Sequence, residues 1–431
     1  MLSSLQPKTK RYTGRHLVVM RNDGVSSGTN LLRQAAGLRV ASSLDFASGF
    51  DRTATLDGAD ALVLPTIGIA IVETVPEQRQ KIAAAMSVDS ALLSIEPERV
   101  VYAASERDNL RAAGTTAEYL EGYRDAVNHL TQRLGASGRN AQVSSSSTPD
   151  ESQTTWGLQV TRVAASRYSG NGIRLAILDT GIDLGHPDFA GRNITTQSFV
   201  AGQPVQDGHG HGTHCVGTAC GPALPNRLPR YGIAYNAEIF VGKVLGDNGS
   251  GADGDILAGI EWAINNGCQV ISMSLTALPD QTPSAAYEQS AKRALSNGTL
   301  IVAAAGNESR RPDSIQPVDH PANCPSIMAV GALDADLQVA FFSNAGLNPN
   351  GGQVDLAGPG VNVRSAWPRP TLYNTISGTS MATPHAAGIA ALLAESQSSV
   401  RGTGLWTLLA QTASRLVAPS RDVGSGLVQA P

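Results

Sequence analysis

Apolar runs that fit buried strands alternate with segments of helical spacing through most of the chain, from Trp156 onward. The segments Asp255–Asn265 and Ala285–Ser296 have helical spacing and alternate with apolar strands such as Leu175–Leu178. Strands that are apolar on both sides predict a parallel sheet covered by helices on both faces. The pattern therefore predicts a three-layer α/β domain over residues 154–431, with reactive groups at the carboxyl ends of its strands.

A smaller set of elements fills the first 110 residues. The pattern predicts a strand over Arg15–Met20, a helix from Thr29, a strand over Gly68–Val75, a helix over Pro76–Met86 and a closing strand within residues 91–104. This order predicts a split β-α-β-β-α-β domain, which is a small ferredoxin-like α+β fold.

Residues 111–153 differ in composition from the regions on either side. A polar helix is predicted over roughly residues 115–134, and the tract Gly135–Gln153 is rich in Gly and Ser and has no apolar period. Tracts of this composition form linkers between domains. We therefore expect an extra helix and a linker between the two domains.

The overall composition is that of an ordinary globular protein, and it narrows the range of partners. The chain has 431 residues, of which 42% are hydrophobic and 16% charged, enough for a large core and a second small domain. The net charge is -4, and no basic run is interleaved with aromatic residues. We therefore do not expect nucleic acid as the main partner. A membrane is not expected either, because no apolar run reaches the roughly eighteen residues that span a bilayer.

The N-terminus and the cysteines bear on the cellular compartment. Basic residues surround only one short apolar piece, Leu17–Met20, in the first thirty residues, so no secretory signal is recognised. This favours a cytoplasmic location, with secretion as the alternative if a leader has been trimmed. The four cysteines are too few to form the framework of so long a chain, and we expect reduced thiols.

The stretch DGHGHGTHC, Asp207–Cys215, contains three histidines, an aspartate and a thiol in nine positions. A zinc site and a general base would both use such residues. Zinc requires three or four ligands, and His211 and His214 lack the glutamate of the helical metalloprotease motif. The small residues that follow predict a helix with His211 near its N-terminus. The stretch alone leaves both interpretations open.

Two further reactive side chains lie next to predicted strand and helix ends. Asp179 directly follows the strand Leu175–Leu178, although a lone Asp-Thr-Gly is also an ordinary turn. Ser380 begins a predicted helix that extends to about Glu395, with Pro384 in its first turn. A serine there meets free backbone N–H groups and the positive end of the helix dipole, although serine is also a common helix cap.

Taken together, these residues indicate one kind of chemistry. Asp179, His211 and Ser380 supply an orienting group, a general base and a nucleophile, which is the set that acyl transfer requires. Asn307 ends the apolar strand IVAAAGN and offers an amide N–H to a developing oxyanion. The set predicts acyl transfer by a serine nucleophile.

The C-terminal part contains four motifs in a fixed order: DTGID, GHGTH, AAAGN and GTSMATPHAAG. In these motifs and their order it resembles the subtilisin-like serine proteases, or subtilases. HGTHC is most similar to the proteinase K-like branch. The resemblance implies that Asp179 orients, His211 transfers the proton, Ser380 attacks, and Asn307 binds the oxyanion together with the Ser380 N–H. It also implies a monomeric endopeptidase that acts on proteins or peptides and needs no cofactor for its chemistry. A metal at His211 is then disfavoured, because the base must be unligated.

In this family the substrate backbone adds as a strand between two enzyme segments, which correspond here to GSGA and SLTA. The candidate substrate-binding residues on these segments are Gly249, Ser250, Gly251, Ser274, Leu275 and Thr276. Relatives commonly have Ser-Leu-Gly-Gly at the second segment. The side chains of Thr276 and Ala277 therefore predict a narrower or displaced pocket wall.

Two acids occupy positions that line the base of the primary specificity pocket in relatives. Glu308 follows Asn307, and Asp319 precedes His320-Pro321, which resembles the family's cis-proline turn. A buried carboxylate pair predicts a preference for Arg or Lys before the scissile bond, whereas solvated acids would set none.

Other acids have less specific interpretations. Asp253 and Asp255 either flank a more distant pocket or cap the helix that follows. Structural calcium commonly stabilises relatives, but the segment Gly221–Gly232 lacks their Asn-rich ligand loop. The oxygen-rich loop Asp183–Asp188 is then the candidate for a structural calcium ion.

The N-terminal unit has the size and element order of a subtilase propeptide. The resemblance makes it an intramolecular chaperone and inhibitor that is removed by self-cleavage. The predicted organisation is a propeptide-like domain at 1–110, an extra helix and linker with the processing site at 111–153, and a catalytic domain at 154–431. If the acidic pocket selects basic residues, the cut is expected after Arg133 or Arg139.

Two other functions fit the same residues. One is a dedicated intracellular maturation protease that cuts a single precursor. The other belongs to a different class, an inactive scaffold that binds peptides without cutting them. The intact set of Asp179, His211, Ser380 and Asn307 argues against the scaffold.

Overall fold

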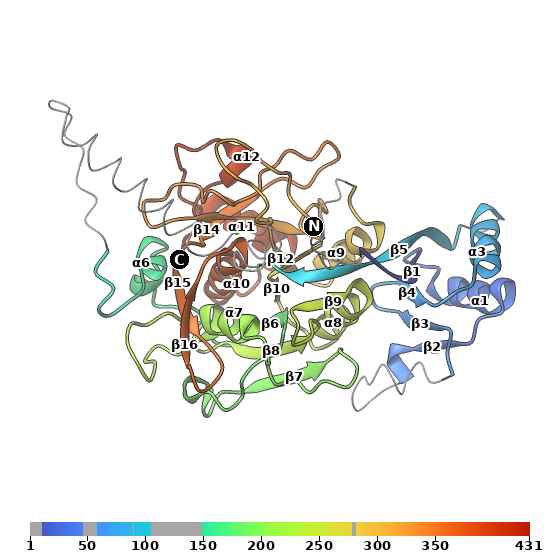
Figure 1. Ribbon diagram of the computed structural model, residues 1–431, viewed down its shortest axis with the longest axis horizontal. Helices are drawn as coiled ribbons and strands as arrows, with labels where there is room; N and C mark the ends of the chain where they lie inside the picture. The colour runs from blue at the N-terminus through green and yellow to red at the C-terminus, as the bar shows by residue number, and fades with distance from the viewer. Residues whose placement is uncertain (1–10, 46–57, 89, 105–148, 278–281) are drawn as a thin grey trace, which may run out of the picture.

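The computed structural model describes residues 11–45, 58–88, 90–104, 149–277 and 282–431, and Figure 1 shows a small N-terminal unit beside a larger C-terminal one. The predicted helix at 115–134 and nearly all of the linker after it, with Arg133 and Arg139, lie outside the described residues. No helix in the described part of the chain is long and apolar enough to cross a membrane.

A sheet of seven parallel strands forms the centre of the C-terminal unit, in the spatial order β14-β13-β12-β10-β6-β8-β7. Its strands are β6 (Arg174–Asp179), β7 (Ile194–Ser198), β8 (Glu238–Lys243), β10 (Val270–Met273), β12 (Leu300–Ala304), β13 (Met328–Leu333) and β14 (Leu356–Pro359). The apolar pattern of the sequence predicts all of these strands except β7. The polar residues of β7 fit its place at the edge of the sheet.

Helices cover both faces of this sheet. In β6, Leu175 and Ile177 belong to the apolar cluster on one side, and Ala176 and Leu178 to the cluster on the other, because successive side chains of a strand alternate. The first cluster includes residues of α7 (His211–Cys220) and α10 (Thr379–Ser396), and the second includes residues of α8 (Asp253–Asn265) and α9 (Ala285–Ser296). The predicted three-layer α/β fold is confirmed.

The N-terminal unit is a sheet of mostly antiparallel strands with two helices. Its elements are β1 (Tyr12–Met20), α1 (Val25–Ala36), β2 (Val40–Ser42), β3 (Ala61–Leu64), β4 (Ile69–Val72), α3 (Pro76–Val88) and β5 (Leu92–Ala103). The strand order is β5-β1-β4-β3-β2. The short β2, which pairs parallel to β3, is an addition to the predicted β-α-β-β-α-β order. α1 begins at Val25, one turn before the predicted Thr29.

Strand β5 joins the two units. It pairs with β1 inside the N-terminal unit, and its C-terminal half pairs antiparallel with β9 (Ser250–Ala252) and β11 (Leu275–Ala277) of the other unit. Figure 1 shows β5 (cyan) extending from the N-terminal unit toward the centre of the molecule. The apolar cluster around α8 and α9 also contains Leu17, Val19 and Ile67, so the two units share a core.

Shorter elements complete the described structure. They are η1 (Ser43–Asp45), α6 (Trp156–Val160), η2 (Val163–Ala165), η3 (Pro187–Phe189), β15 (Val363–Ala366), β16 (Tyr373–Ile376), α11 (Thr403–Thr412) and α12 (Ser420–Val423). β15 and β16 form an antiparallel hairpin.

Two local predictions have different outcomes. All four cysteines are buried and free, as expected. The prediction that Pro384 lies in the first turn of its helix was wrong. α10 begins at Thr379, so Pro384 lies in the second turn. There it removes the backbone N–H that would otherwise bond to the carbonyl oxygen of Ser380.

Candidate active site

The end of β6 and the start of α7 bring an aspartate and a histidine together. Asp179 is the last residue of β6, and His211 is the first residue of α7. Asp179 Oδ1 lies 2.8 Å from His211 Nδ1, and both side chains are buried. The Thr180 N–H also donates to Asp179 Oδ1, at 2.8 Å, which fixes the carboxylate. This contact puts a hydrogen on Nδ1 and makes Nε2 the basic nitrogen of the neutral ring.

The surroundings of His211 favour uptake of a proton. Burial by itself lowers the pKa of His211, but the carboxylate of Asp179 and then Cys215 raise it, and the net pKa lies well above 6.5. Nε2 of His211 is buried and has no hydrogen-bond partner among the described residues. This nitrogen is therefore available to accept a proton from a neighbouring hydroxyl.

Asp207 holds the loop that leads into α7. Its Oδ1 accepts from the N–H groups of His209 and Gly210 at 3.0 and 2.8 Å. Its Oδ2 accepts from the N–H and the hydroxyl of Thr213 at 2.8 and 2.6 Å. This role of Asp207 was not predicted from the sequence, although an aspartate before a Gly-rich turn is a signal for such bonds. Asp207 thus fixes the backbone on both sides of His211.

The zinc interpretation of DGHGHGTHC is not supported by the geometry. Within the described residues, the group that could hold a metal is Asp179, His211 and Cys215, whose ligand atoms lie within 4.8 Å of one another. His209 and His214 do not belong to it. His214 Nε2 lies 3.0 Å from the Val363 carbonyl oxygen, and burial lowers its pKa to about 3. His211 Nδ1 and Asp179 Oδ1 already bond to each other.

Ser380, the second residue of α10, faces the end of β5. Its Oγ donates to the carbonyl oxygen of Ala104 and lies 3.2 Å from that of Ser274. The described contacts include no hydrogen bond between Ser380 Oγ and His211 Nε2. The structure therefore brings the serine hydroxyl against a peptide carbonyl group, with the histidine left unbonded on its Nε2 side.

The carbonyl oxygen of Ser380 has donors that replace the missing N–H of Pro384. The Ser274 hydroxyl donates to it at 2.8 Å, and the Cys215 thiol donates at 3.7 Å. Burial raises the pKa of the Cys215 thiol, which keeps it protonated. Ser274 therefore contacts Ser380 through both its side chain and its backbone carbonyl.

Asn307 follows β12 and is oriented by the first residue of α10. Its Oδ1 accepts from the N–H and the hydroxyl of Thr379 at 2.8 and 2.9 Å. These two bonds direct its Nδ2 away from Thr379, and Nδ2 is buried without a partner among the described residues. A Cβ built on Gly378 would lie 3.1 Å from the Ala104 carbonyl oxygen and 3.5 Å from Asn307 Nδ2, so both atoms lie beside Gly378.

The two predicted substrate segments hold β5 in extended form. The N–H of Ala103 donates to the Gly249 carbonyl at 2.9 Å, and the N–H of Ala104 donates to the Ser274 carbonyl at 3.2 Å. The predicted residues Gly249, Ser250, Gly251, Ser274, Leu275 and Thr276 all lie on these segments. The side chains of Thr276 and Ala277 do not displace the strand, since both residues pair with β5 in regular register.

Glu308 and Asp319 lie together around Gly306. A Cβ on Gly306 would lie 2.5 Å from Asp319 Oδ2 and 2.8 Å from Glu308 Oε2. Nδ2 of Asn344 donates to Asp319 Oδ2 at 3.2 Å and to Glu308 Oε2 at 2.8 Å. The N–H of Asn307 also donates to Glu308 Oε2, at 2.7 Å. Burial, and then the neighbouring Glu308, raise the pKa of Asp319 well above 3.8. Asp319 is therefore protonated where most aspartates are charged.

Asp253 contacts β5 farther from Ser380. Its Oδ2 accepts from the Arg99 N–H at 2.8 Å, and its Oδ1 lies 3.1 Å from His320 Nε2. The N-cap of α8 is Ala252, so neither Asp253 nor Asp255 is the cap. The peptide bond after His320 is cis, as the resemblance implies.

The loop Asp183–Asp188 does not fit a calcium site. Arg369 donates to Asp183 through Nε and Nη2, both at 2.9 Å. Burial raises the pKa of Asp183, but the bonds from Arg369 outweigh it and lower the pKa to about 2. Asp188 Oδ2 accepts from the hydroxyls of Tyr231 and Tyr373 at 2.6 and 3.0 Å. Both carboxylates already have protein donors where an ion would need free oxygens.

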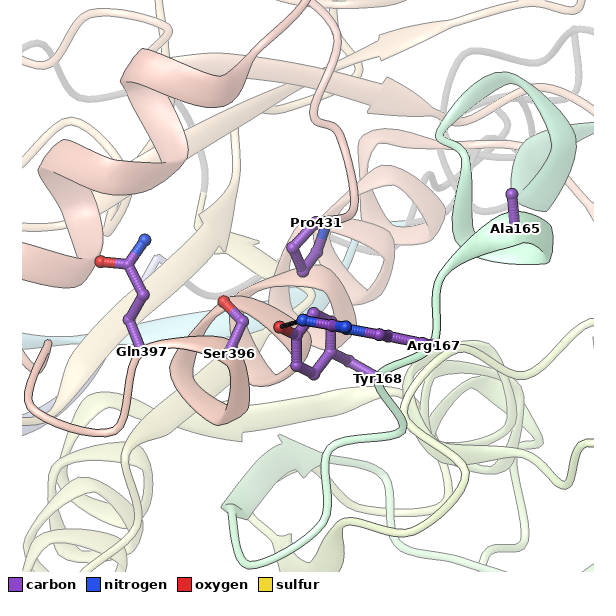
Figure 2. A pocket seen from close by; sticks show the side chains of 6 residues that line it. All are labelled: Ala165, Arg167, Tyr168, Ser396, Gln397 and Pro431. Atoms are coloured by element: carbon purple, nitrogen blue, oxygen red, sulfur yellow. Dashed lines mark hydrogen bonds between the residues drawn. The ribbon is translucent and has the colours of Figure 1, made fainter.

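A surface pocket near residue 431 is separate from these residues. Its lining consists of Ala165, Arg167, Tyr168, Ser396, Gln397 and Pro431 (Figure 2). Arg167 donates to the Tyr168 hydroxyl at 2.9 Å and lies over its ring. None of the predicted site residues lines it, so it has no part in the chemistry at Ser380.

The contact of the Ala104 carbonyl with Ser380 was not predicted from the sequence. Ala104 has no reactive side chain, and it follows the apolar run VVYA that pairs with the C-terminal unit. The sequence does contain a signal for Ala104 as the end of a strand, because the apolar run stops there and polar residues follow from Ser105 onward. Arg133 and Arg139 lie outside the described residues.

Comparison with known proteins agrees with the motifs. A sequence model described as the subtilase family matches residues 170–426. The chain is 42% identical over 279 residues to an alkaline protease of Alkalihalobacillus alcalophilus, covering 64% of this chain and 68% of that protein. It is 41% identical over 279 residues to Subtilisin Savinase of Lederbergia lenta, covering 64% of this chain and 96% of that protein. A solved cold adapted subtilisin-like serine proteinase aligns with TM-score 0.56 and 31% identity, covering 65% of this chain and 99% of that one.

Proposed function

The chain belongs to the subtilase family and is a subtilisin-like serine endopeptidase, and from this premise we propose that Ser380, His211 and Asp179 perform its reaction. The observation on which the proposal rests is the contact of Ser380 Oγ with the carbonyl group of an extended peptide. His211 Nε2 and Asn307 Nδ2 are buried without partners among the described residues, which supports their roles as base and oxyanion donor.

In the proposed reaction, Ser380 Oγ attacks the carbonyl carbon of the substrate while His211 Nε2 takes up the hydroxyl proton. The N–H on Nδ1 donates to Asp179, whose negative charge stabilises the imidazolium. Asn307 Nδ2 and the Ser380 backbone N–H donate to the oxyanion. The C–N bond then breaks, and the proton on His211 passes to the leaving amine.

An acyl ester on Ser380 remains after this first half. His211 Nε2 then accepts a proton from water, and the oxygen of that water attacks the ester carbonyl. The bond to Ser380 Oγ breaks, the proton returns to Ser380, and the second product leaves as a carboxylic acid. No metal or other cofactor takes part in these steps.

We propose that the chain is a zymogen whose N-terminal unit is cut off at the bond that follows Ala104. The support is that β5 lies between β9 and β11, with the Ala104 carbonyl at Ser380. This changes the expected position of the first cut from Arg133 or Arg139 to Ala104. After the cut, β5 would stay between β9 and β11 and act as an inhibitor.

We propose further that external substrates with Arg or Lys before the scissile bond are preferred. The support is the pair of Glu308 and Asp319, of which Asp319 is buried and has no hydrogen-bond partner for its Oδ1 among the described residues. A cationic side chain next to Asp319 would favour its ionised form. The small side chain of Ala104 is compatible with the pocket but does not use these acids.

Peptides that differ only at this position test the preference. Arg should be favoured over Leu, and the gap should widen as pH rises because Asp319 then loses its proton more easily. Asp319→Asn should remove the widening. A preference for Leu or Phe over Arg at every pH would refute this part of the proposal.

Labelling with a fluorophosphonate tests the reaction itself. The chain should gain one label, and Ser380→Ala should lose it, whereas Ser290→Ala, which changes another buried serine, should keep it. Absence of labelling in the unaltered chain would favour the peptide-binding scaffold. Proteome-wide cleavage profiling then separates a broad protease from one dedicated to a single precursor.

Intact mass and N-terminal sequencing test the processing. The active species should begin at Ser105, and Ser380→Ala should accumulate the full-length chain. A mature-length product from Ser380→Ala would contradict self-processing, and a different first residue would contradict the cut after Ala104.

A further inference from the structure

A fully buried lysine lies beside the turn that follows Asp179. Lys243 is the last residue of β8 and pairs with Asp179 in the parallel register of β6 and β8 (Figure 1). Its side chain is 0% exposed. Its Nζ donates to the carbonyl of Thr180 at 2.5 Å and to Asp247 Oδ1 at 2.7 Å. The ammonium group is therefore bonded to the backbone directly after the proposed orienting aspartate.

Asp247 connects this lysine to the loop that precedes His211. Its Oδ1 also accepts from the Gly208 N–H at 3.1 Å. Asp247 itself lies in the turn between β8 and β9, which also contains Gly249, whose carbonyl accepts a backbone bond from β5. The pair of Lys243 and Asp247 therefore joins three segments, namely the turn after β6, the loop before α7 and the start of the substrate segment.

Gly208 fits closely against the carboxylate of Asp247. A Cβ on Gly208 would lie 2.5 Å from Asp247 Cγ, which is closer than nonbonded carbon atoms approach. The φ of Gly208 lies outside the left-handed region that favours glycine. The missing side chain of Gly208 is therefore needed for the contact with Asp247 and not for the backbone conformation.

The pair of Lys243 and Asp247 is a poor device for stability alone. Removing an ammonium group from water costs free energy that an ion pair returns only in part, and an apolar residue of similar volume is often as stable. The Asp247 side chain is 49% exposed, so water screens its attraction for the buried ammonium group. An apolar side chain, however, could not bond to the Thr180 carbonyl and to Asp247 at once. What the pair supplies is a fixed distance between the segments that it joins.

We propose that Lys243 and Asp247 are positioning residues of the reaction, which hold the turn after β6 and the loop before α7 at the separation that proton transfer requires. The inference rests on the proposed roles of Asp179 and His211. Lys243 acts on a backbone carbonyl of the turn, and Asp247 acts on a backbone N–H of the loop. A displacement of about 1 Å at a reacting group can lower a rate by about 100-fold.

Lys243→Met removes the ammonium group and keeps most of the side-chain volume. The measurement is hydrolysis of a fluorogenic peptide after self-processing, with kcat counted per serine labelled by a fluorophosphonate. kcat should fall about 10- to 100-fold while KM changes by less than about threefold. The unfolding free energy, measured in the Ser380→Ala background, should stay close to that of the chain with Lys243. Where a variant processes itself too slowly for this assay, the rate at which its full-length chain disappears replaces kcat.

Asp247→Asn separates the geometry of the pair from its charge. Asn keeps an oxygen that can accept from Gly208 and Lys243, but it leaves the buried ammonium group without an opposite charge. kcat should stay within about threefold of the unaltered chain, while the unfolding free energy falls. Asp247→Ala also removes the acceptor and should lower kcat about as far as Lys243→Met. A merely structural role predicts instead that kcat follows the unfolding free energy through all three variants.

Gly208→Ala tests the fit between the loop and the carboxylate. The added Cβ meets Asp247, so the loop or the carboxylate must move and their hydrogen bond is lost. Gly208→Ala should lower kcat at least about fivefold in the unaltered chain and have little further effect in the Asp247→Ala chain. Equal effects in both backgrounds would count against the proposed fit.

Lys292→Met is the matched control. Lys292 also has a carboxylate partner four positions away in the chain, Glu288, but its side chain is 61% exposed. kcat should change by less than about twofold, as expected for an exposed ion pair. The inference is overturned if Lys243→Met and Asp247→Ala stay within about twofold of Lys292→Met, or if kcat follows the unfolding free energy across the set.

A measurement that does not depend on activity keeps the two proposals apart. In the Ser380→Ala chain, the hydrogen on His211 Nδ1 lies in a bond to Asp179, and a hydrogen in such a bond resonates far downfield in the NMR spectrum. Lys243→Met should shift or broaden this signal, and Lys292→Met should not. An active enzyme whose Lys243→Met variant behaves like Lys292→Met loses this inference and keeps its proposed function. An inactive chain in which Lys243→Met still moves the signal keeps the positioning of His211 and loses the proposed function.

Discussion

At the scale of single residues, the buried pair of His211 and Asp179 determines how the proposed active site depends on pH. Attraction between opposite charges is stronger in a buried site than in water. Burial alone disfavours the imidazolium, yet Asp179 and Cys215 raise the net pKa of His211 well above 6.5. A general base must be neutral before it can take up a proton, so the protonated form of His211 is expected to be inactive.

The first prediction is therefore an acid limb in the pH profile of kcat/KM. Activity should rise with pH, with a midpoint above 6.5, as His211 loses its proton. Asp179→Asn should move this midpoint to lower pH, because the imidazolium loses its stabilising charge, and should lower kcat by about 10⁴-fold. Hydrolysis of a fluorogenic peptide between pH 5 and pH 11 measures both effects. A midpoint below 6.5, or one that Asp179→Asn leaves in place, would contradict the assignment.

At the scale of elements, the start of α10 shows how a helix adapts to a proline near the nucleophile. Pro384 removes the bond that would normally satisfy the carbonyl of Ser380. The Ser274 hydroxyl, from the loop between β10 and β11, supplies the replacement. The segment that holds the substrate strand is thereby bonded to the residue that is proposed to attack it.

The second prediction concerns this bond. Ser274→Ala leaves a buried carbonyl with only the weak thiol donor of Cys215, which should cost about 1–3 kcal/mol of unfolding free energy. Misalignment of Ser380 should lower kcat about 3- to 30-fold while KM changes less. Ser290→Ala is the control, because the Ser290 hydroxyl bonds to a carbonyl within α9. Equal kcat values for the two variants would argue against a positioning role.

The third prediction concerns the loop closed by Arg369. The pKa of Asp183 is lowered to about 2 in the folded state, so the pair stabilises the protein at pH above about 4 and loses its effect as pH falls toward 2. Arg369→Met should lower the unfolding free energy at pH 7 only modestly, because the Arg369 side chain is 55% exposed and water screens the pair. The cost should shrink near pH 2. Thermal unfolding in the Ser380→Ala background measures this loss of unfolding free energy. A loss that does not change with pH would mean that Arg369→Met acts by removing packing contacts and not by removing the ion pair.

At the scale of the whole molecule, the N-terminal unit contacts the C-terminal unit at two separate sites. One is the groove that holds β5. The other is the turn at residues 65–68, where the Thr66 N–H donates to Glu261 and the Pro65 carbonyl accepts from Arg293. Because both belong to one folded unit, binding at one raises the effective concentration at the other. Release of the unit is then expected to require loss of both contacts.

The fourth prediction tests the residue that the molecule presents to Ser380. Ala104→Asp would add a negative charge at the position where Ala104 now meets the proposed active site. The Glu308 carboxylate would repel this charge, so self-processing should slow by at least about tenfold. Ala104→Asn is the control of equal size, and the amount of full-length chain over time is the measurement. Equal rates for both variants would show that the pocket does not respond to charge.

The sequence was sufficient to predict the fold class, the family and the proposed reactive residues. Asp179, His211, Asn307 and Ser380 could be proposed because each follows a recognisable strand or begins a helix. The carboxyl ends of parallel strands meet at one edge of the sheet, so such residues are expected to lie close together. Family membership is confirmed by the comparisons, whereas the roles of these residues stay predictions.

The sequence by itself determined the order of helices and strands and the candidate chemistry, because these depend on neighbouring residues. Only the tertiary structure decided that Ala104 meets Ser380, that Arg369 closes the loop at Asp183, and that Glu261 holds Thr66. The last two residues are 195 positions apart in the chain. Contacts at such separations follow from how whole units pack, and neither apolar periodicity nor a short motif contains that information.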